Sequence, residues 1–311
     1  MERAEVYGAA PSPVAIDKNL QAFNADAKAR HLSAATLSKL KTLTDQLEKF
    51  CTKAGVTTTD QLTTDVLRDF RASWEDGAVA ALKKFERLRT LCRFLMIPCD
   101  LKAPRVKLKP TLPFTAEQMG QIMLACDAFS ASGRYRAKNR TRIRAMVLLL
   151  RYSGIRIGDA VTLKRERIDA EGKLQLYTAK TGTPVYIPLP DFVIAALSEV
   201  SPFYDDEGKV TGAIFWNGKG KATSAIGVWE RTFKRLFEIA KISDGHAHRL
   251  RDTFAVGLLQ QGVSLEDVSV LLGHSSIRIT EKHYAPWVKS RQELLEAAVK
   301  KVWSRAFEDL V

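Results

Sequence analysis

The stretch 246–254, HAHRLRDTF, carries two histidines and two arginines within six residues and runs directly into an apolar segment. His248 and Arg251 are three residues apart, so on a helix they project from the same face. A cluster of this kind contributes little to a folded core, because unpaired cations are costly to bury. We therefore expect the cluster to bind an anion, whose nature the rest of the chain should indicate.

Four further residues could contribute to such a site. His274 lies in LLGHSS, at the predicted end of a helix, and Tyr284 follows ten residues later in ITEKHYAPW. Arg156 follows the glycine of YSGIRIGDAVTL, where an apolar helix should end, and Lys180 lies in the predicted hairpin turn AKTGT. Taken one by one, each has an ordinary structural explanation.

Those explanations differ from residue to residue. Arg156 could cap the carboxyl end of its helix, where a cation is favourable, and Lys180 could be a solvated turn lysine. His248 could be a structural histidine, and His274 could be a helix-end cap. Tyr284 could anchor its helix with a buried ring and a bonded hydroxyl. It is the occurrence of these residues together and in order that argues against the separate explanations.

The chain as a whole is basic. It has 311 residues, with 48 lysines and arginines against 35 acidic residues, and a net charge of +13. Much of the excess lies in two stretches without acidic residues, 101–110 (LKAPRVKLKP) and 134–144 (RYRAKNRTRIR), which we interpret as an extended linker and a basic loop. Concentrated charge is typical of a protein that binds a polyanion such as nucleic acid, although two solvated loops are the simpler alternative. The predicted DNA contacts are Lys102, Arg105, Lys107, Lys109, Arg140 and Arg142.

Length and composition limit the class of protein. A chain of this length suggests two domains with sizeable cores. Its hydrophobic content of 46% fits a soluble globular protein, and no apolar run reaches the ~18 residues of a membrane helix. The first residues lack the apolar core of a secretory signal, and the four cysteines show no zinc-ligand spacing. We expect a cytoplasmic protein, associated with the nucleoid, that contacts no membrane.

Helical spacing of apolar residues predicts an N-terminal bundle of three helices, over 33–53, 60–74 and 77–96. A basic segment with several prolines follows, and proline favours extended geometry over helix. The predicted segments are a flexible tail over 1–17, a helical domain over 18–100, a basic interdomain linker over 101–113 and a second domain over 114–311.

The second domain should be mainly helical with one β-hairpin. Residues 172–190, GKLQLYTAKTGTPVYIPLP, alternate apolar residues on both sides of a glycine-containing turn, which predicts two antiparallel strands. Helices are predicted after a capping Thr115, in the apolar run before Gly154, and over 191–200, 226–241, 264–273 and 289–307. The expected fold class is mainly α with a small antiparallel β-sheet.

The order SGIRIGD, AKTG, HRLRDTFA, LLGH and HY resembles the tyrosine recombinase (phage integrase) family. The likeness covers residues 114 to about 288. Its most specific part is HRLRDTF followed by LLGHSS and the tyrosine, whereas AKTG alone would be a weak signal. The resemblance implies a tyrosine recombinase catalytic domain, and the preceding helical bundle is consistent with the family's core-binding (SAM-like) domain.

The resemblance implies site-specific DNA recombination through a covalent 3′-phosphotyrosyl intermediate. Tyr284 would be the nucleophile. His248 would help to remove its proton, because a phenol with a pKa of about 10 is a weak nucleophile at neutral pH. Arg156 and Arg251 would hold the phosphate oxygens in fork geometry, and His274 would add a further donor.

Two other positions follow from the same resemblance. Lys180 resembles the general acid that protonates the leaving 5′-oxygen. Asp159 matches a position where the family often carries a carboxylate, which we expect to orient the cations of the site. Because the phosphotyrosyl ester conserves the energy of the phosphodiester, the reaction would need no ATP, metal or other cofactor.

The chain departs from the family pattern at Asp252, where many members carry histidine, and we expect this residue to touch none of the six candidate positions. His246 and His283 adjoin motif residues without occupying motif positions, and we interpret both as structural or peripheral. Arg249 would contact a phosphate or nothing.

The family implies a homo-tetramer on paired duplex DNA sites. The helix over 289–307, with Leu294, Val302 and Trp303 on one face, would dock on a neighbouring subunit or pack on its own domain. A bundle that starts near residue 18 leaves no room for an arm-binding domain, which favours a simple Xer-like or mobile-element type. Two other functions stay open: a non-catalytic DNA-binding regulator on the same scaffold, and DNA relaxation like that of a type IB topoisomerase.

Overall fold

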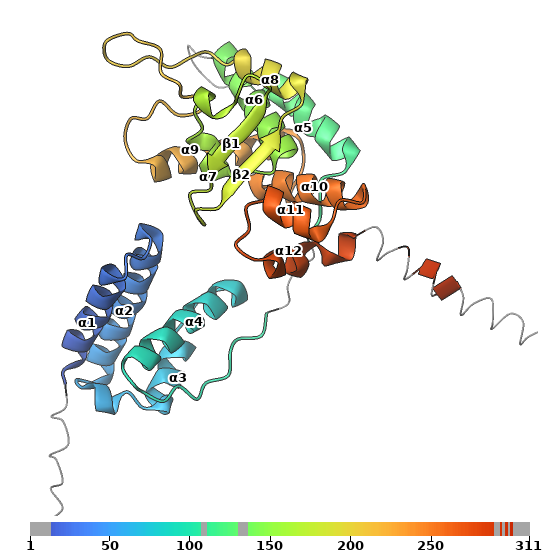
Figure 1. The fold of residues 1–311 in the computed structure, drawn as a ribbon. Helices are drawn as coiled ribbons and strands as arrows, with labels where there is room; N and C mark the ends of the chain where they lie inside the picture. The colour runs from blue at the N-terminus through green and yellow to red at the C-terminus, as the bar shows by residue number, and fades with distance from the viewer. Residues whose placement is uncertain are drawn as a thin grey trace, which may run out of the picture. The chain divides into compact units, whose positions relative to one another are not determined.

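The computed structural model of the protein describes residues 14–106, 111–129 and 136–288, together with five helical positions between 293 and 300. The chain forms two compact units, Met1–Lys109 and Pro110–Val311 (Figure 1). The expected class is confirmed, since the described residues are mostly helical and carry a two-stranded antiparallel sheet.

The N-terminal unit is a bundle of helices. Its described part contains α1 (Ile16–Ala29), α2 (Ala34–Ala54), α3 (Thr64–Ala72) and α4 (Ala78–Phe94), with a short 3₁₀ turn before α3. The three predicted helices correspond to α2, α3 and α4. Ser33 caps α2 as expected, because its hydroxyl accepts a hydrogen bond from Thr36 N at 3.2 Å.

Helix α1 was not predicted, and its start corrects the extent of the expected tail. Ile16 and Asp17 belong to this helix rather than to a flexible segment. The apolar side chains that α1 buries, among them Leu20, Phe23 and Ala27, keep the helical spacing of three to four residues. They pack into the same core as the buried residues of α2, which gives the segment its order.

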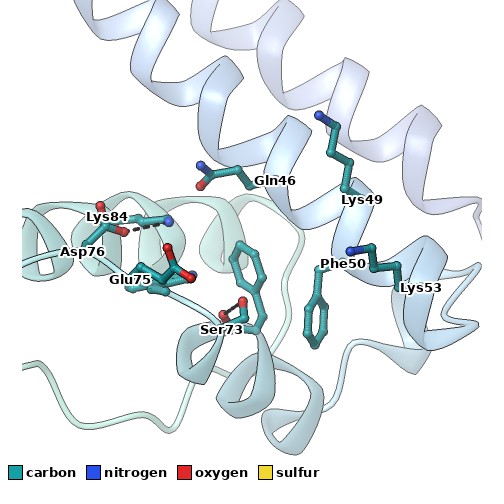
Figure 2. A pocket seen from close by; sticks show the side chains of 10 residues that line it. Gln46, Lys49, Phe50, Lys53, Ser73, Glu75, Asp76 and Lys84 are labelled. Atoms are coloured by element: carbon teal, nitrogen blue, oxygen red, sulfur yellow. Dashed lines mark hydrogen bonds and ion pairs between the residues drawn. The ribbon is translucent and has the colours of Figure 1, made fainter.

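A cavity of about 600 Å³ opens in this unit between the second half of α2 and the segment that joins α3 to α4 (Figure 2). Its lining combines charged and aromatic side chains, with Lys49 and Lys53 on α2 and Phe50 below them. On the opposite side, Lys84 Nζ lies 2.9 Å from an Asp76 carboxylate oxygen and 4.7 Å from the centre of the Trp74 ring.

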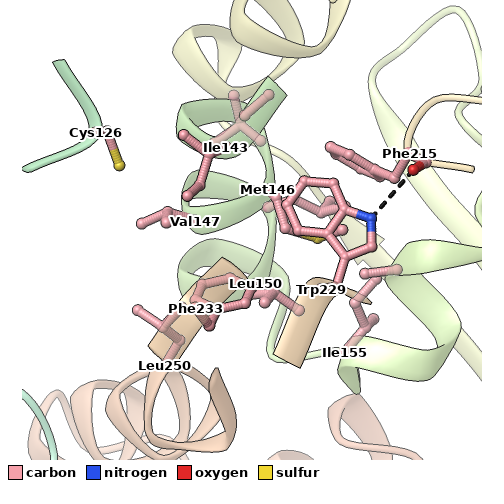
Figure 3. Packing of buried hydrophobic residues seen from close by; sticks show 14 of the residues in the cluster. Cys126, Ile143, Met146, Val147, Leu150, Ile155, Phe215, Trp229, Phe233 and Leu250 are labelled. Atoms are coloured by element: carbon pink, nitrogen blue, oxygen red, sulfur yellow. Dashed lines mark hydrogen bonds between the residues drawn. The ribbon is translucent and has the colours of Figure 1, made fainter. Parts of the chain in front are cut away.

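The C-terminal unit is built around α6 (Arg136–Ser153). Ile143, Met146 and Leu150 of α6 are fully buried and pack with Trp229 and Phe233 of α9, which spans Ala222–Ile239 (Figure 3). The indole Nε1 of Trp229 donates to the carbonyl oxygen of residue 215 at 3.1 Å, so its one polar group is satisfied inside the core.

Around this core lie α5 (Ala116–Ala128), α7 (Ile157–Val161), α8 (Asp191–Ser198), α9 (Ala222–Ile239), α10 (Ala247–Gln260), α11 (Leu265–Leu271) and α12 (Ile277–Tyr284). Thr115 caps α5 as predicted, and its hydroxyl accepts from Gln118 N at 3.1 Å. The predicted hairpin is also confirmed: β1 (Lys173–Tyr177) pairs antiparallel with β2 (Pro184–Pro188), with Leu174 opposite Ile187.

The expected basic loop over 134–144 is wrong for the described residues, because α6 already begins at Arg136. The helix continues into its basic first half because arginine is a good helix former and because these arginines bond to the rest of the unit. Arg142 donates to the carbonyl oxygen of Ser201 at 2.8 Å, and Arg144 pairs with Asp127 at 3.1 Å.

The predicted helix over 289–307 lies almost entirely outside the described residues; the positions described there, between 293 and 300, are helical. Leu294, Val302 and Trp303 are not among them. Within the described parts of the chain, no helix is both long enough and apolar enough to cross a membrane.

Candidate active site

Arg251 lies at the centre of the candidate site. It belongs to α10, whose first turn is capped by His246 Nδ1, accepting from Arg249 N at 3.2 Å. The Arg251 side chain is buried and donates from Nη1 to Gly154 O at 2.6 Å and from Nη2 to Leu272 O at 2.7 Å. The guanidinium therefore ties α10 to the ends of α6 and α11, and it is fixed in place before any ligand binds.

Arg156 immediately precedes α7, and its charge acts on Arg251. Its Nη1 is buried and has no hydrogen-bond partner among the described residues, and the same is true of Arg251 Nε. Burial, and next the charge of Arg156, lower the pKa of Arg251 to about 10. The two guanidiniums repel each other, and each has an N–H donor without a hydrogen-bond partner among the described residues. They are suited to bind one anion between them, because an anion would offset the two positive charges and accept hydrogen bonds from both donors.

His274 extends this group from the end of α11. Its Nδ1 lies 2.8 Å from Thr280 Oγ1, which fixes the ring. Burial, followed by the charges of Arg251 and Arg156, lowers its pKa to about 3, so the ring is neutral at physiological pH. A neutral imidazole whose Nδ1 is held in this way can present Nε2 as a donor to an anion.

Tyr284 is the last residue of α12 and is only 2% exposed. Its hydroxyl donates to Asp252 Oδ1 at 2.6 Å. Burial, and then the Asp252 carboxylate, raise the pKa of Tyr284 above its ordinary value, while Arg251 and Arg156 act in the opposite direction. The phenol is therefore protonated in the protein alone.

Our expectation that Asp252 touches none of the candidate residues is wrong. Asp252 lies one turn after His248 on α10, and His248 Nε2 lies 3.8 Å from the carboxylate oxygen that also accepts from Tyr284. The four-residue spacing of a histidine and an aspartate was the available signal, because residues so spaced share a helix face. Nothing in the sequence indicated that this face meets α12.

His248 itself is the more open member of this group, with 59% of its side chain exposed. Partial burial lowers its pKa and the charge of Asp252 opposes that change, while Arg251 and Arg156 lower it further. His248 is thus a solvent-exposed member of the group, next to Asp252 and within the field of both guanidiniums.

Among the six candidates, Lys180 stands outside the electrostatic group that the other five form. It is exposed in the turn between β1 and β2 and makes no hydrogen bond or ion pair with the described residues. The turn around it is well anchored, since Ala179 N donates to Asp159 Oδ1 at 2.8 Å and Thr181 Oγ1 donates to Gly273 O at 3.1 Å. Asp159 therefore ties the hairpin turn to α7, and its expected role in orienting the cations stays a prediction.

Arg249 has a structural role rather than either of the two roles we expected. It is buried, and its guanidinium donates to Leu112 O at 2.9 Å and to Pro113 O at 3.2 Å. It also pairs with Asp244 at 2.7 Å and lies over the Phe114 ring. Through these contacts, Arg249 holds residues 112–114, at the start of the C-terminal unit, against α10.

The predicted DNA-contact residues fall into three groups. Lys102 and Arg105 are exposed, and Lys107 and Lys109 lie outside the described residues. Arg140 is exposed and its Nε donates weakly to Phe129 O at 3.4 Å. Arg142 is half-buried against the Phe203 ring, and burial and the nearby Arg165 lower its pKa. All six DNA contacts stay predictions, and Arg142 is the least accessible of the four described.

Comparison with known proteins identifies the class of protein to which this fold and these side chains belong. The Phage integrase family matches residues 113–290, which is more than half of the chain, and the chain belongs to that family. It is 33% identical over 147 residues to tyrosine recombinase XerC of Roseiflexus castenholzii, and spans 46%, about half, of the length of that relative.

Two further comparisons extend the likeness beyond this family match. The chain is 27% identical over 212 residues to tyrosine recombinase XerC of Lactobacillus delbrueckii subsp. bulgaricus, over 64% of this chain and 69% of that one. A solved lambda integrase tetramer bound to a Holliday junction has the same fold, with a TM-score of 0.62 and 17% identity over 85% of this chain and 78% of that one.

Proposed function

We propose that this chain is a site-specific DNA recombinase that cuts and rejoins duplex DNA through a covalent 3′-phosphotyrosyl intermediate. The observation that carries the proposal is the pair Arg156 and Arg251, each with a buried guanidinium nitrogen that has no hydrogen-bond partner among the described residues, in the electrostatic neighbourhood of Tyr284. A DNA phosphate supplies the negative charge and the acceptor oxygens that this arrangement lacks.

In the proposed reaction the Tyr284 oxygen attacks phosphorus and the bond from phosphorus to the 5′-oxygen breaks. Arg156 and Arg251 stabilise the charge that develops on the non-bridging oxygens, and neutral His274 adds a hydrogen bond. Arg251 contributes without reorganisation because two backbone carbonyls already hold it. The 5′-oxygen leaves as a hydroxyl with a proton from Lys180, whose exposed position in an anchored turn allows it to approach bound DNA.

The rest of the assembly belongs to the same proposal. The partner is duplex DNA, and the active form is a homo-tetramer on paired sites in the cytoplasm, at the nucleoid. A shared fold with the lambda integrase tetramer supports the tetramer. We further propose a tail, core-binding domain, linker and catalytic domain with the boundaries given above, except that the first helix starts at Ile16. The described residues contain no membrane-spanning helix.

The test uses a DNA site obtained with the protein itself. A Tyr284→Phe variant selects bound duplexes from a random library, and the selected site is then made as a nicked suicide substrate. Wild-type protein and a Tyr204→Phe control, which alters an exposed tyrosine, should form a denaturation-resistant adduct, whereas Tyr284→Phe should bind without forming one. Tight binding without any wild-type adduct would instead indicate a DNA-binding regulator, and relaxation of supercoiled DNA without site preference would indicate a topoisomerase-like activity.

A further inference from the structure

We propose that Asp252 is a further catalytic residue, the group that accepts the proton of Tyr284 when the phenol attacks DNA. The proposal rests on the recombinase function above and assigns to Asp252 the step that the family resemblance gave to His248.

The Asp252 carboxylate already lies where it can take the phenol proton. Asp252 Oδ1 lies 2.6 Å from the Tyr284 hydroxyl, and both groups are buried, with exposures of 9% for Asp252 and 2% for Tyr284. A carboxylate can only accept in this bond, so the phenol proton already points at Asp252. A candidate base must lie within hydrogen-bond reach of the proton that it removes, and Asp252 meets that condition before DNA arrives.

His248, the alternative base, lies against Asp252. His248 Nε2 lies 3.8 Å from Asp252 Oδ1, so the described contact of the imidazole is to the carboxylate rather than to the phenol. The imidazole is also open to solvent. In this arrangement His248 lies against the carboxylate rather than at the phenol proton, and we assign it as a positioning residue for the proton transfer.

Charged and ionisable side chains surround the pair of Asp252 and Tyr284. Asp252 is faced by His248 and Arg251 from its own helix and by the Tyr284 hydroxyl from α12. Tyr284 lies in the field of Arg251 and of Arg156, both of which favour its ionised form, and the ring of His283 lies 6.2 Å from its own ring. Burial and Asp252 nevertheless raise the pKa of Tyr284. The proton therefore leaves only as the bond to phosphorus forms, because esterification removes the charge that the buried phenolate would carry.

The Tyr284 oxygen forms a bond to phosphorus and its proton passes to Asp252 Oδ1. The phosphorus–5′-oxygen bond breaks, and the leaving oxygen takes a proton from Lys180. In rejoining, the 5′-hydroxyl attacks the phosphotyrosine, Lys180 takes the hydroxyl proton, and Asp252 returns its proton to the departing phenol.

The experiment compares two leaving groups on the selected suicide substrate, the ordinary 5′-oxygen and a 5′-bridging sulfur, which departs without a proton. Asp252→Asn keeps the size of the side chain and an oxygen that can accept the tyrosine hydrogen bond, but the amide cannot take up the proton. We expect it to form the adduct about 10²–10⁴-fold more slowly than wild type on both substrates. Lys180→Ala should be slow on the oxygen substrate and restored on the sulfur substrate. Asp191→Asn, a carboxylate-to-amide change in the first turn of α8, should match wild type.

Three results would overturn the proposal: an Asp252→Asn rate within twofold of wild type, a rate above wild type, or rescue of Asp252→Asn by the sulfur substrate. Asp252→Glu, which retains a carboxylate, should recover at least tenfold over Asp252→Asn. If the asparagine variant does not fold, Asp252→Ser, which accepts a hydrogen bond without acting as a base, takes its place. Absence of a wild-type adduct would remove the recombinase function and this proposal together, whereas a normal adduct rate in Asp252→Asn removes this proposal alone.

Discussion

Arg251 and Gly154 are joined by a hydrogen bond of 2.6 Å, from the buried guanidinium to the backbone carbonyl, across 97 residues of the chain. The carbonyl is available because the helix α6 has ended at the preceding residue, and Gly154 adopts a left-handed conformation with φ of +62°. The end of one helix thus positions the arginine of another, and the backbone at Gly154 is part of the support of the site.

Gly154→Ala should therefore destabilise the protein. A Cβ at this position would lie 2.3 Å from the Phe254 ring and would also be strained by the positive φ. Gly262→Ala is the matched control, since its φ is +90° but nothing lies within 4 Å of its Cβ. Gly154→Ala should lose about 1–3 kcal/mol more unfolding free energy than the control in urea denaturation, as expected for overpacking. Equal losses would contradict a steric role for Phe254.

Replacement of Arg249 by methionine should weaken the fold without changing the electrostatics of DNA binding. The variant loses the charge-assisted bonds to Leu112 O and Pro113 O, so we expect the unfolding free energy to fall by roughly 1.5–3 kcal/mol. The slope of log affinity against log salt should not change. Arg105→Met should show the reverse pattern, with unchanged stability and a slope smaller by about 1. A reduced salt slope for Arg249→Met would assign this residue to the DNA interface.

The depressed pKa of His274 predicts a loss of stability in acid. Between about pH 6.5 and the folded pKa of about 3, the unfolded chain binds a proton at this position and the folded chain does not. Unfolding free energy should therefore fall as pH decreases through this interval, by at most about 1.4 kcal/mol per pH unit. His274→Gln should reduce that dependence, and His31→Gln, at an exposed histidine, should not. Parallel curves for wild type and His274→Gln would contradict the burial of a neutral imidazole.

Lys180→Ala should separate catalysis from folding. Because this side chain is exposed and unbonded within the described structure, its removal should change unfolding free energy by no more than about 0.5 kcal/mol. The rate of adduct formation should nevertheless fall by about 10²–10⁴-fold if the lysine protonates the leaving oxygen. Unchanged melting with an unchanged adduct rate would leave Lys180 as a solvated turn residue.

Sequence patterns predicted the parts of the fold that depend on neighbours along the chain. The hairpin followed from strict alternation around Gly182, and the caps at Ser33 and Thr115 from side chains that bond within three residues. These local patterns failed to predict helical structure where a helix depends on contacts with residues distant in the sequence. Helix α1 is ordered by packing on α2, and the basic first half of α6 bonds to residues as far away as Ser201.

The order of the motifs was enough to select the six candidate residues and the family, because each motif is a short local pattern. Which of these side chains meet is a matter of packing between α7, α10, α11 and α12, and no local spacing encodes it. The fold brings Arg156, Arg251 and His274 into one electrostatic group and leaves Lys180 outside it. It also adds Asp252, whose bond to Tyr284 spans 32 residues and exists only because two helix faces are buried against each other.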